Sequence, residues 1–133
     1  MMIYTKQEQA NLEAVKAWEA AYAEGPARFM EHYCDEFLIE LPLQEYTLNN
    51  KEDFIRGESA MQRLFTDSGI KIEWMTVKDD VASVKVLLWG VKESGERYEQ
   101  RMFSLLTMRD GKVLNDTTYC VMVPGIDQLE IMG

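Results

Sequence analysis

Two polar residues in the second half of the chain are candidates for contact with a bound molecule. Arg101 lies in an apolar segment, where an unpaired charge would be costly to bury. Its guanidinium either pairs across a sheet with Glu73, Glu99 or Asp116, or binds a carboxylate of a ligand. The hydroxyl of Thr118 can hydrogen-bond a ligand, although threonine is also common in strands.

Aromatic residues form a second candidate group. Trp18, Tyr22, Trp74 and Trp89 could line a pocket for a ring-bearing ligand, because aromatic side chains offer a large and rigid contact area. The alternative is that each of them is an ordinary core residue. Both interpretations stay open at the level of the sequence.

The sequence contains few residues that could bind a metal ion and no motif that binds a nucleotide. The chain has two cysteines, Cys34 and Cys120, and one histidine, His32, which are too few and too far apart for a zinc site or a disulfide scaffold. We expect reduced, partly buried thiols and a surface or helix-terminal histidine. Because there is no glycine-rich phosphate loop or dinucleotide fingerprint, we predict no cofactor and no metal.

The charge balance limits the classes of partner. Acidic residues outnumber basic ones 23 to 14, giving a net charge of −9, whereas nucleic-acid binding needs clustered lysine and arginine. The same sign argues against anionic membranes, and no apolar run is long enough to span one. The polar segment from Met1 to Asn11 does not look like a signal peptide. We therefore predict a cytoplasmic protein that binds neither nucleic acid nor membranes.

The elements that must position these residues begin with helices. Apolar residues recur at three- and four-residue steps from Lys6 to Glu24, which predicts an amphipathic first helix. Gly25 ends it, and Pro26 starts a short second helix that carries Tyr33. A third helix is expected to open near Gly57 and to stop at Gly69.

The rest of the chain is dominated by strands. A short first strand, Glu36–Leu41, ends at Pro42 because proline cannot donate to a sheet ladder. Four further strands alternate in polarity and are separated by turn signals. The turns are expected at Asp79-Asp80, Ser94-Gly95 and Asp110-Gly111, and the last strand at Lys112 to about Val123. Four consecutive strands joined in this way predict an antiparallel meander.

One strand is apolar on both faces. In Val86-Leu87-Leu88-Trp89 neither face is polar, so a second layer is expected over the outside of the sheet. A homodimer is the simplest cover, and we predict one. The alternative is that the C-terminal segment from Pro124 to Gly133 folds back over that face.

The order of elements resembles that of the nuclear transport factor 2-like superfamily, and within it the SnoaL-like and ketosteroid isomerase-like branch. The marks of the resemblance are Trp18-Glu-Ala-Ala-Tyr22-Ala-Glu-Gly25, the strand from Phe37 to Pro42, Arg56-Gly57, and Arg109-Asp110-Gly111-Lys112-Val113 followed by Tyr119. The resemblance implies an α+β fold over residues 1–133 as one domain. In that fold a curved antiparallel sheet wraps around N-terminal helices as a cone (cystatin-like) with an apolar pocket, usually in a dimer.

The catalytic residues of the related enzymes do not transfer to this chain. Where ketosteroid isomerases have a general base before the proline of the first strand, this chain has Leu41, which cannot move a proton. Trp18 stands at the place of their oxyanion-donating tyrosine and Ser104 near that of their second acid. The set of limonene epoxide hydrolases is also incomplete, because Thr118 stands at the place of an aspartate. Glu40, beside the base position, points outward on a regular strand unless a bulge precedes Pro42.

We therefore hypothesise a small-molecule protein of the SnoaL-like type that binds a compact apolar or aromatic ligand. It would be an isomerase, cyclase or lyase with a non-standard polar set, Arg101, Ser104 and Thr118, that stabilises an enolate-like oxyanion. The alternative is a non-catalytic binding or dimerisation module whose pocket is filled by its own side chains. The predicted pocket residues are Trp18, Tyr22, Tyr33, Phe37, Leu41, Trp74, Trp89, Arg101, Ser104 and Thr118.

Overall fold

The first helix, α1 (Lys6–Tyr22), starts at a capping box that also fixes the helix to the sheet. The Thr5 hydroxyl accepts from the Glu8 backbone N–H at 3.1 Å, and the Glu8 carboxylate accepts from the Thr5 backbone N–H at 2.9 Å. The same carboxylate accepts from the Asp79 backbone N–H at 2.7 Å, in a turn far along the chain. The predicted apolar stripe, including Val15 and Trp18, is buried.

Two further helices follow, with boundaries that differ from those predicted. Helix α2 (Pro26–Met30) is as short as expected, but Tyr33 begins the first strand and does not belong to this helix. Helix α3 (Lys51–Gln62) starts at Asn50, whose side chain accepts from the Asp53 backbone N–H at 3.1 Å, so Gly57 lies inside the helix. The prediction that Gly69 stops this helix was wrong, because Gly69 lies in a strand.

The computed structural model describes residues 3–120, and these form one six-stranded sheet in the order β2-β1-β6-β5-β4-β3. The strands are β1 (Tyr33–Leu41), β2 (Tyr46–Leu48), β3 (Asp67–Lys78), β4 (Val81–Val91), β5 (Arg97–Arg109) and β6 (Lys112–Cys120). A 3₁₀ turn, η1 (Pro42–Gln44), joins β1 to β2.

The four-strand meander predicted from the sequence is confirmed. Strands β3 to β6 pair antiparallel in succession, and the chain reverses at Asp79-Asp80, Ser94-Gly95 and Asp110-Gly111. Asp79 and Asp110 have φ values of 54° and 52°, and Gly111 has 76°, as tight hairpins require. The sheet is mixed, however, because β1 pairs parallel to β6. Residues 121–123, expected in the last strand, lie outside the described residues.

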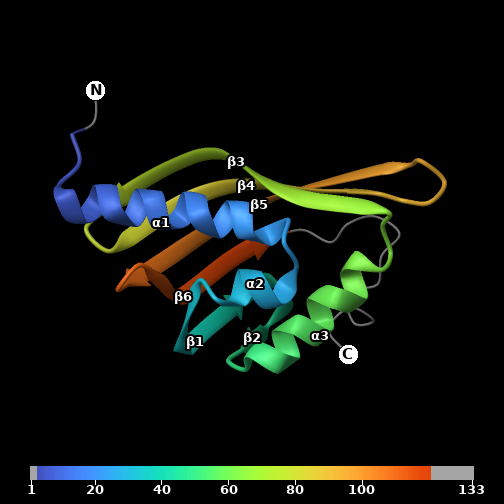
Figure 1. Ribbon diagram of the computed structural model, residues 1–133, viewed down its shortest axis with the longest axis horizontal. Helices are drawn as coiled ribbons and strands as arrows, with labels where there is room; N and C mark the ends of the chain where they lie inside the picture. The colour runs from blue at the N-terminus through green and yellow to red at the C-terminus, as the bar shows by residue number, and fades with distance from the viewer. Residues whose placement is uncertain (1–2, 121–133) are drawn as a thin grey trace.

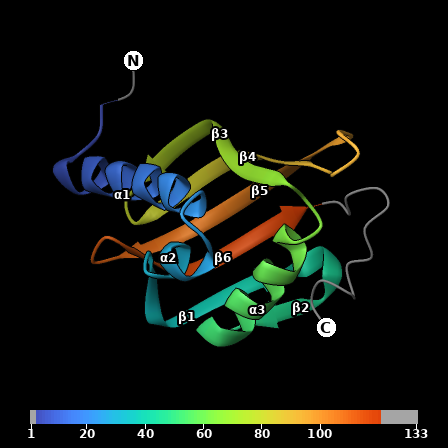
Figure 2. The same cartoon turned by 45° about the vertical axis from the view of Figure 1, so that its right-hand side comes forward.

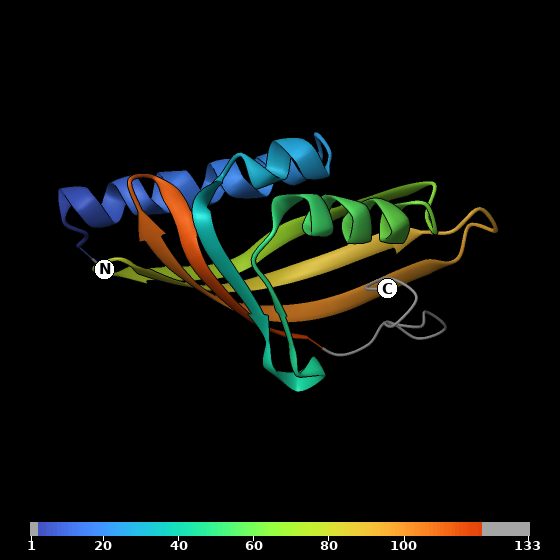
Figure 3. The ribbon, with the colours of Figure 1, turned by 90° about the horizontal axis from the view of Figure 1, so that it is seen from below.

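The helices all lie on one side of the curved sheet (Figure 1, Figure 3). Buried side chains of the helices and of the strands form the hydrophobic core of the protein. Figure 2 shows α1 crossing the half of the sheet that contains β3 and β4, while α3 lies over the other half near β1 and β2. This α+β arrangement confirms the fold class predicted from the sequence. No helix within residues 3–120 is long and apolar enough to cross a membrane.

Strand alternation decides which side chains face the helices. Val84 on β4, Ser104 on β5 and Thr118 on β6 are register partners, and all three are buried on the concave face. One residue away, Phe103 and Tyr119 are partners on the convex face and are each 41% exposed. The concave face is therefore the place where side chains from several strands meet under the helices.

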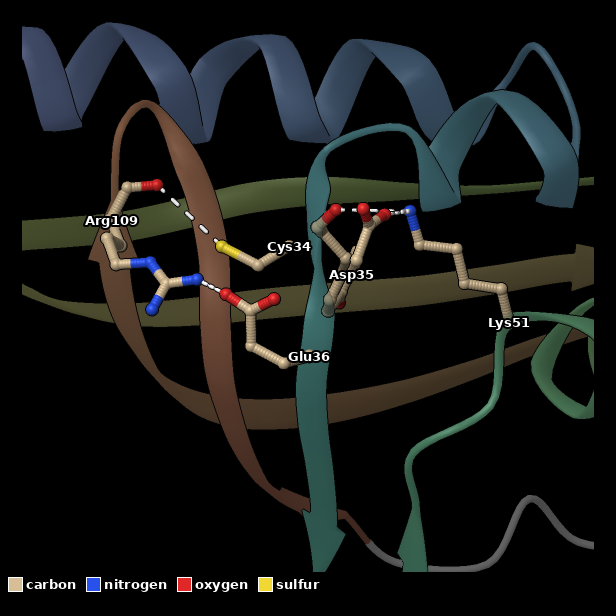
Figure 4. A network of polar contacts seen from close by, with 6 residues as sticks. Cys34, Asp35, Glu36, Lys51 and Arg109 are labelled. Carbon is tan, nitrogen blue, oxygen red and sulfur yellow. Dashed lines mark hydrogen bonds and ion pairs between the residues drawn. The ribbon is translucent and has the colours of Figure 1, made fainter.

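The N-terminus of α3 is attached to β1 by a lysine (Figure 4). Lys51 Nζ lies 3.3 Å from the Tyr33 carbonyl oxygen and 3.4 Å from Asp35 Oδ1. On the other side of β1, Glu36 forms an ion pair with Arg109, and Cys34 Sγ lies 3.8 Å from the Arg109 carbonyl oxygen. Because Tyr33 reaches the interior, the lysine contact fixes α3 relative to a residue of the candidate site.

Candidate functional site

A cavity of about 200 Å³ lies between the helices and the concave face of the sheet. Its walls are largely aromatic and aliphatic, with contributions from all three helices and all six strands. For comparison, an apolar cavity of roughly 150 Å³ holds benzene. The space therefore suits a compact, largely apolar molecule.

A buried carboxyl group, that of Asp116, lies in the wall of this cavity and is 5% exposed. The Tyr33 hydroxyl donates to Asp116 Oδ2 at 2.7 Å, and the Trp18 indole N–H donates to the Tyr33 oxygen at 3.1 Å. Residues from α1, β1 and β6 thus form one chain of hydrogen bonds. Its direction is fixed, since the indole can only donate.

A second chain of hydrogen bonds reaches the other oxygen of Asp116. The Thr118 hydroxyl donates to Asp116 Oδ1 at 2.5 Å, and Ser104 Oγ lies 2.7 Å from Thr118 Oγ1. Because the Thr118 proton is used on Asp116, the Ser104 hydroxyl must donate to Thr118. Both chains therefore end by donating to Asp116, so its carboxyl group is held as an acceptor.

Burial and hydrogen bonding act on Asp116 in opposite directions. Burial disfavours the charged form and raises the pKa of Asp116, while the hydroxyls of Thr118 and Tyr33 favour the charged form and lower it. Burial is the larger effect, so the pKa lies above the usual aspartate value. A carboxyl group with a raised pKa is a stronger base than an ordinary aspartate and suits proton transfer.

A second carboxyl group, Glu58 on α3, lies in the same wall. The Tyr22 hydroxyl donates to Glu58 Oε1. Burial raises the pKa of Glu58, and burial together with the nearby Glu58 charge raises the pKa of Tyr22 well above its ordinary value. The cavity therefore contains two separate carboxyl–phenol pairs.

The end of β6 and its neighbour β5 contribute further polar groups. Gln44 Nε2 donates to the Cys120 carbonyl oxygen at 3.0 Å, and burial raises the pKa of the Cys120 thiol. The Gln100 side chain, also in the wall, interacts with the Cys120 thiol, and apart from that contact its buried nitrogen has no hydrogen-bond partner among residues 3–120. An amide donor in this position is suited to a carbonyl oxygen of a ligand.

Similarity to known proteins is consistent with this geometry. Residues 13–115 match the family model described as the SnoaL-like domain. The chain belongs to the SnoaL-like domain family. No curated protein sequence matches it significantly.

Solved structures of the same fold are numerous but distant in sequence. A protein described as a SnoaL-like polyketide cyclase, from Jannaschia sp. CCS1, is 17% identical with a TM-score of 0.74, over 90% of this chain and 91% of that one. An NTF2-like protein from Anabaena variabilis ATCC 29413 is 17% identical with a TM-score of 0.70, over 92% and 96%.

A hypothetical protein of ketosteroid isomerase-like fold from Catenulispora acidiphila DSM 44928 was solved in complex with trimethylamine. It is 16% identical with a TM-score of 0.69, over 80% of this chain and 84% of that one. At these identities the likeness establishes the NTF2-like fold.

Most of the residues predicted for the pocket of this SnoaL-like domain lie around the cavity. They are Trp18, Tyr22, Tyr33, Leu41, Trp89, Ser104 and Thr118. Trp89 is the register partner of Gly69, where an added side chain would collide with its indole, and the Arg97 guanidinium lies 4.9 Å from its ring.

The structure places the other three predicted residues elsewhere. Phe37 packs in the core beside Tyr33, with ring centroids 5.6 Å apart. Trp74 is 51% exposed, because a bulge between Ile72 and Trp74 shifts the register of β3 and turns the indole outward. Neither Phe37 nor Trp74 lines the cavity among the described residues.

Arg101 also lies outside the cavity, on the convex face. It forms a two-pronged ion pair with Glu73, with nitrogen–oxygen distances of 3.0 and 3.2 Å. This is the sheet pairing that the sequence left open. Glu40 does not line the cavity either, and its carboxylate accepts from Asn115 Nδ2 at 3.3 Å.

Sequence reasoning missed Asp116 and Glu58 as site residues. A signal for Asp116 was present, since residues two apart on a strand share a face and Thr118 was already a candidate. For Glu58 the signal was weaker, because it depended on where α3 begins. With Asn50 as the N-cap, Phe54, Glu58 and Met61 fall at helical spacing on one face.

Proposed function

We propose that this SnoaL-like protein binds a compact, largely apolar molecule in the cavity and moves a proton on it with Asp116. The observation that carries this proposal is the buried carboxyl group of Asp116 in the cavity wall, held by Tyr33 and Thr118. In the polar set that we hypothesised from the sequence, Asp116 takes the place of Arg101. Ser104 and Thr118 remain in it as residues that position the base.

The chemistry that fits is proton abstraction next to a carbonyl group. The Asp116 carboxylate would accept a proton from a carbon acid, and the electron pair of the broken C–H bond would move onto the carbonyl oxygen as an enolate. The amide of Gln100 is suited to donate to that oxygen. If the enolate is conjugated with a double bond, return of the proton from Asp116 to another carbon completes an isomerisation. If the enolate carbon attacks a second carbonyl group, the oxygen of that group takes the proton back from Asp116 and a cyclisation is complete.

The relatives are compatible with this class of function. The Jannaschia protein is described as a polyketide cyclase, and the Catenulispora protein was solved with trimethylamine, a compact small molecule. The open cavity of about 200 Å³ also weighs against a module filled by its own side chains. A non-catalytic binding protein of the same fold remains the second candidate, favoured by Leu41 at the place of the ketosteroid isomerase base.

Deuterium exchange tests the proposal with a simple probe. The compact ketone 2-indanone has acidic protons next to its carbonyl group, and their exchange with D₂O can be followed by proton NMR. We expect the protein to accelerate exchange over buffer, and Asp116→Asn to reduce the acceleration by about 100-fold or more. Equal rates for the folded variant and the wild type would overturn the role of Asp116, and binding without acceleration would favour the non-catalytic alternative.

A second copy of the chain over the convex face is the remaining part of the proposal. The register places Trp74, Lys85, Phe103 and Tyr119 in one row across four strands, and the three aromatic residues are exposed. Residues 124–133, the other cover considered, lie outside the described residues. Native mass spectrometry should show a dimer that Phe103→Glu dissociates and Leu43→Glu, at an exposed residue of η1, does not. A monomeric wild type would contradict this.

A further inference from the structure

The ionisable groups around the cavity are all acidic or neutral. Within residues 3–120, its wall contains three carboxyl groups, those of Asp53, Glu58 and Asp116, and no lysine, arginine or histidine. The remaining residues, 1–2 and 121–133, contain no basic side chain by sequence.

The three carboxyl groups differ in the groups that pair with them or donate hydrogen bonds to them. Asp53 Oδ1 pairs with Arg56 at 3.0 Å. Asp116 is held by two hydroxyl donors. Glu58 accepts from Tyr22 through one oxygen, and neither the ion pairs nor the charges acting on it include a basic side chain of the described residues. Glu58 is thus the carboxyl group with acceptor capacity left over for a ligand.

Several aromatic rings line the same part of the cavity wall as Glu58. Tyr22 packs edge-on against Phe29 at 5.3 Å between ring centroids, and Phe29 stacks on Phe54 at 5.9 Å. Phe54 lies one helical turn before Glu58, and Phe65 also lines the cavity. Ring faces attract cations, and a carboxylate among aromatic rings is the combination that recognises alkylammonium groups.

We infer that the ligand of this cavity carries a protonated amine, which pairs with Glu58 and lies against the aromatic rings beside it. The inference rests on the proposed function in that it concerns the same cavity, and it names the class of ligand. The amine end would lie toward α3 and the reacting carbon toward Asp116. A carboxylate or phosphate ligand would instead meet these three carboxyl groups and, within residues 3–120, no basic side chain in the wall, which makes anionic ligands unfavourable.

Three probes of one size separate the effect of charge from that of shape. Benzylamine, benzyl alcohol and benzoate share one ring and a one-carbon arm, and at neutral pH they are cationic, neutral and anionic. Isothermal titration calorimetry is expected to show benzylamine binding at least about tenfold more tightly than benzyl alcohol, with benzoate weakest. Labelled methyl groups of Met61 and Met102, both in the wall, would report by NMR that the cavity is occupied.

Matched variants assign the preference to one residue. Glu58→Gln keeps the size of the side chain and its ability to accept from Tyr22, and it should bring benzylamine to within about twofold of benzyl alcohol. Asp53→Asn removes a carboxylate that is already paired with Arg56, so the preference should persist. Circular dichroism confirms that each variant is folded.

The outcomes separate the inference from the proposed function. If benzyl alcohol binds as tightly as benzylamine, or if the preference survives in Glu58→Gln, the amine inference is overturned while ligand binding in the cavity stands. If none of the three probes binds or perturbs the two methionines, the binding function itself is contradicted along with the inference.

Discussion

Two carboxyl groups of the cavity wall, Asp116 and Glu58, have similar surroundings but differ in the number of hydrogen-bond donors that hold them. Each has a tyrosine partner, and burial raises the pKa of each. Asp116 stands on a strand and receives donors on both oxygens, whereas Glu58 stands on a helix and receives one. A base must be held in one geometry, and a ligand anchor must keep acceptor capacity free. The comparison assigns the first task to Asp116 and the second to Glu58.

Exchanging each carboxyl group for its amide gives the largest expected effect and tests this division directly. Asp116→Asn should reduce exchange of 2-indanone by about 100-fold or more while leaving benzylamine binding within about threefold. Glu58→Gln should do the reverse, weakening benzylamine by about tenfold and changing exchange by less than about threefold. Proton NMR and calorimetry on the same samples provide both values. Similar losses of both properties in both variants would remove the distinction.

The pH dependence of exchange distinguishes Tyr33, the partner of Asp116, from Tyr22, the partner of Glu58. Tyr33→Phe removes a donor to the charged form of Asp116, so the pKa of that carboxyl group rises further. Exchange needs the carboxylate form of Asp116. The acidic limb of the pH–rate profile, where the exchange rate falls as the pH is lowered, should therefore move to higher pH by about one unit. Tyr22→Phe removes a donor to Glu58, not to Asp116, and should leave the acidic limb of the pH–rate profile where it is. A rate loss in Tyr33→Phe without a shift of the limb would indicate a packing role for Tyr33.

Stability should reveal the cost of burying Asp116. Its pKa is higher in the folded protein than in the unfolded chain, so the folded state holds the proton over a range of pH where the unfolded state has lost it. The contribution of this group is thus present below its unfolded pKa and is lost as pH rises through the folded one. The free energy of unfolding of Asp116→Asn minus that of the wild type should increase between pH 4 and pH 7. Urea titrations measure it, and a constant difference would contradict the raised pKa.

The smallest effect is expected for Arg101, for which the sequence left open an ion pair across the sheet or a contact with a ligand. Arg101 pairs with Glu73 on the convex face, with 59% of its side chain exposed. Arg101→Ala should change benzylamine binding and ketone exchange by less than about twofold, and stability by about 0 to 1 kcal/mol. The same titrations provide the check, and a tenfold loss of binding would place the ligand on the opposite face of the sheet.

The sequence predicted the elements of the fold better than it predicted which face each side chain would occupy. The meander follows from alternation and turn residues, both of which are local, and the Asp110-Gly111 hairpin has a positive φ at each residue. The parallel pairing of β1 with β6 joins segments about 80 residues apart, and no local signal specifies it. The three-residue strand β2 is likewise stabilised by its partner β1.

The differences between the predicted pocket residues and those that line the cavity arise from strand alternation, and the misplaced helix boundaries arise from two glycines. Arg101 and Ser104 are three residues apart on a regular strand and cannot share a face, so Ser104 in the cavity implies Arg101 outside it. The outward position of the Trp74 side chain depends on a bulge in β3 that no residue of the sequence predicts. Gly57 and Gly69 were taken as helix boundaries, but Gly69 is a strand residue that leaves room for the Trp89 indole.

A crystal structure of the protein with 2-indanone bound tests the central claim most directly. The account predicts the ketone in the cavity between the helices and the concave sheet, with a carbon next to the carbonyl group roughly 3 to 3.5 Å from an oxygen of Asp116. A ketone bound outside the cavity, or one held inside it with both of those carbons turned away from Asp116, would contradict the account.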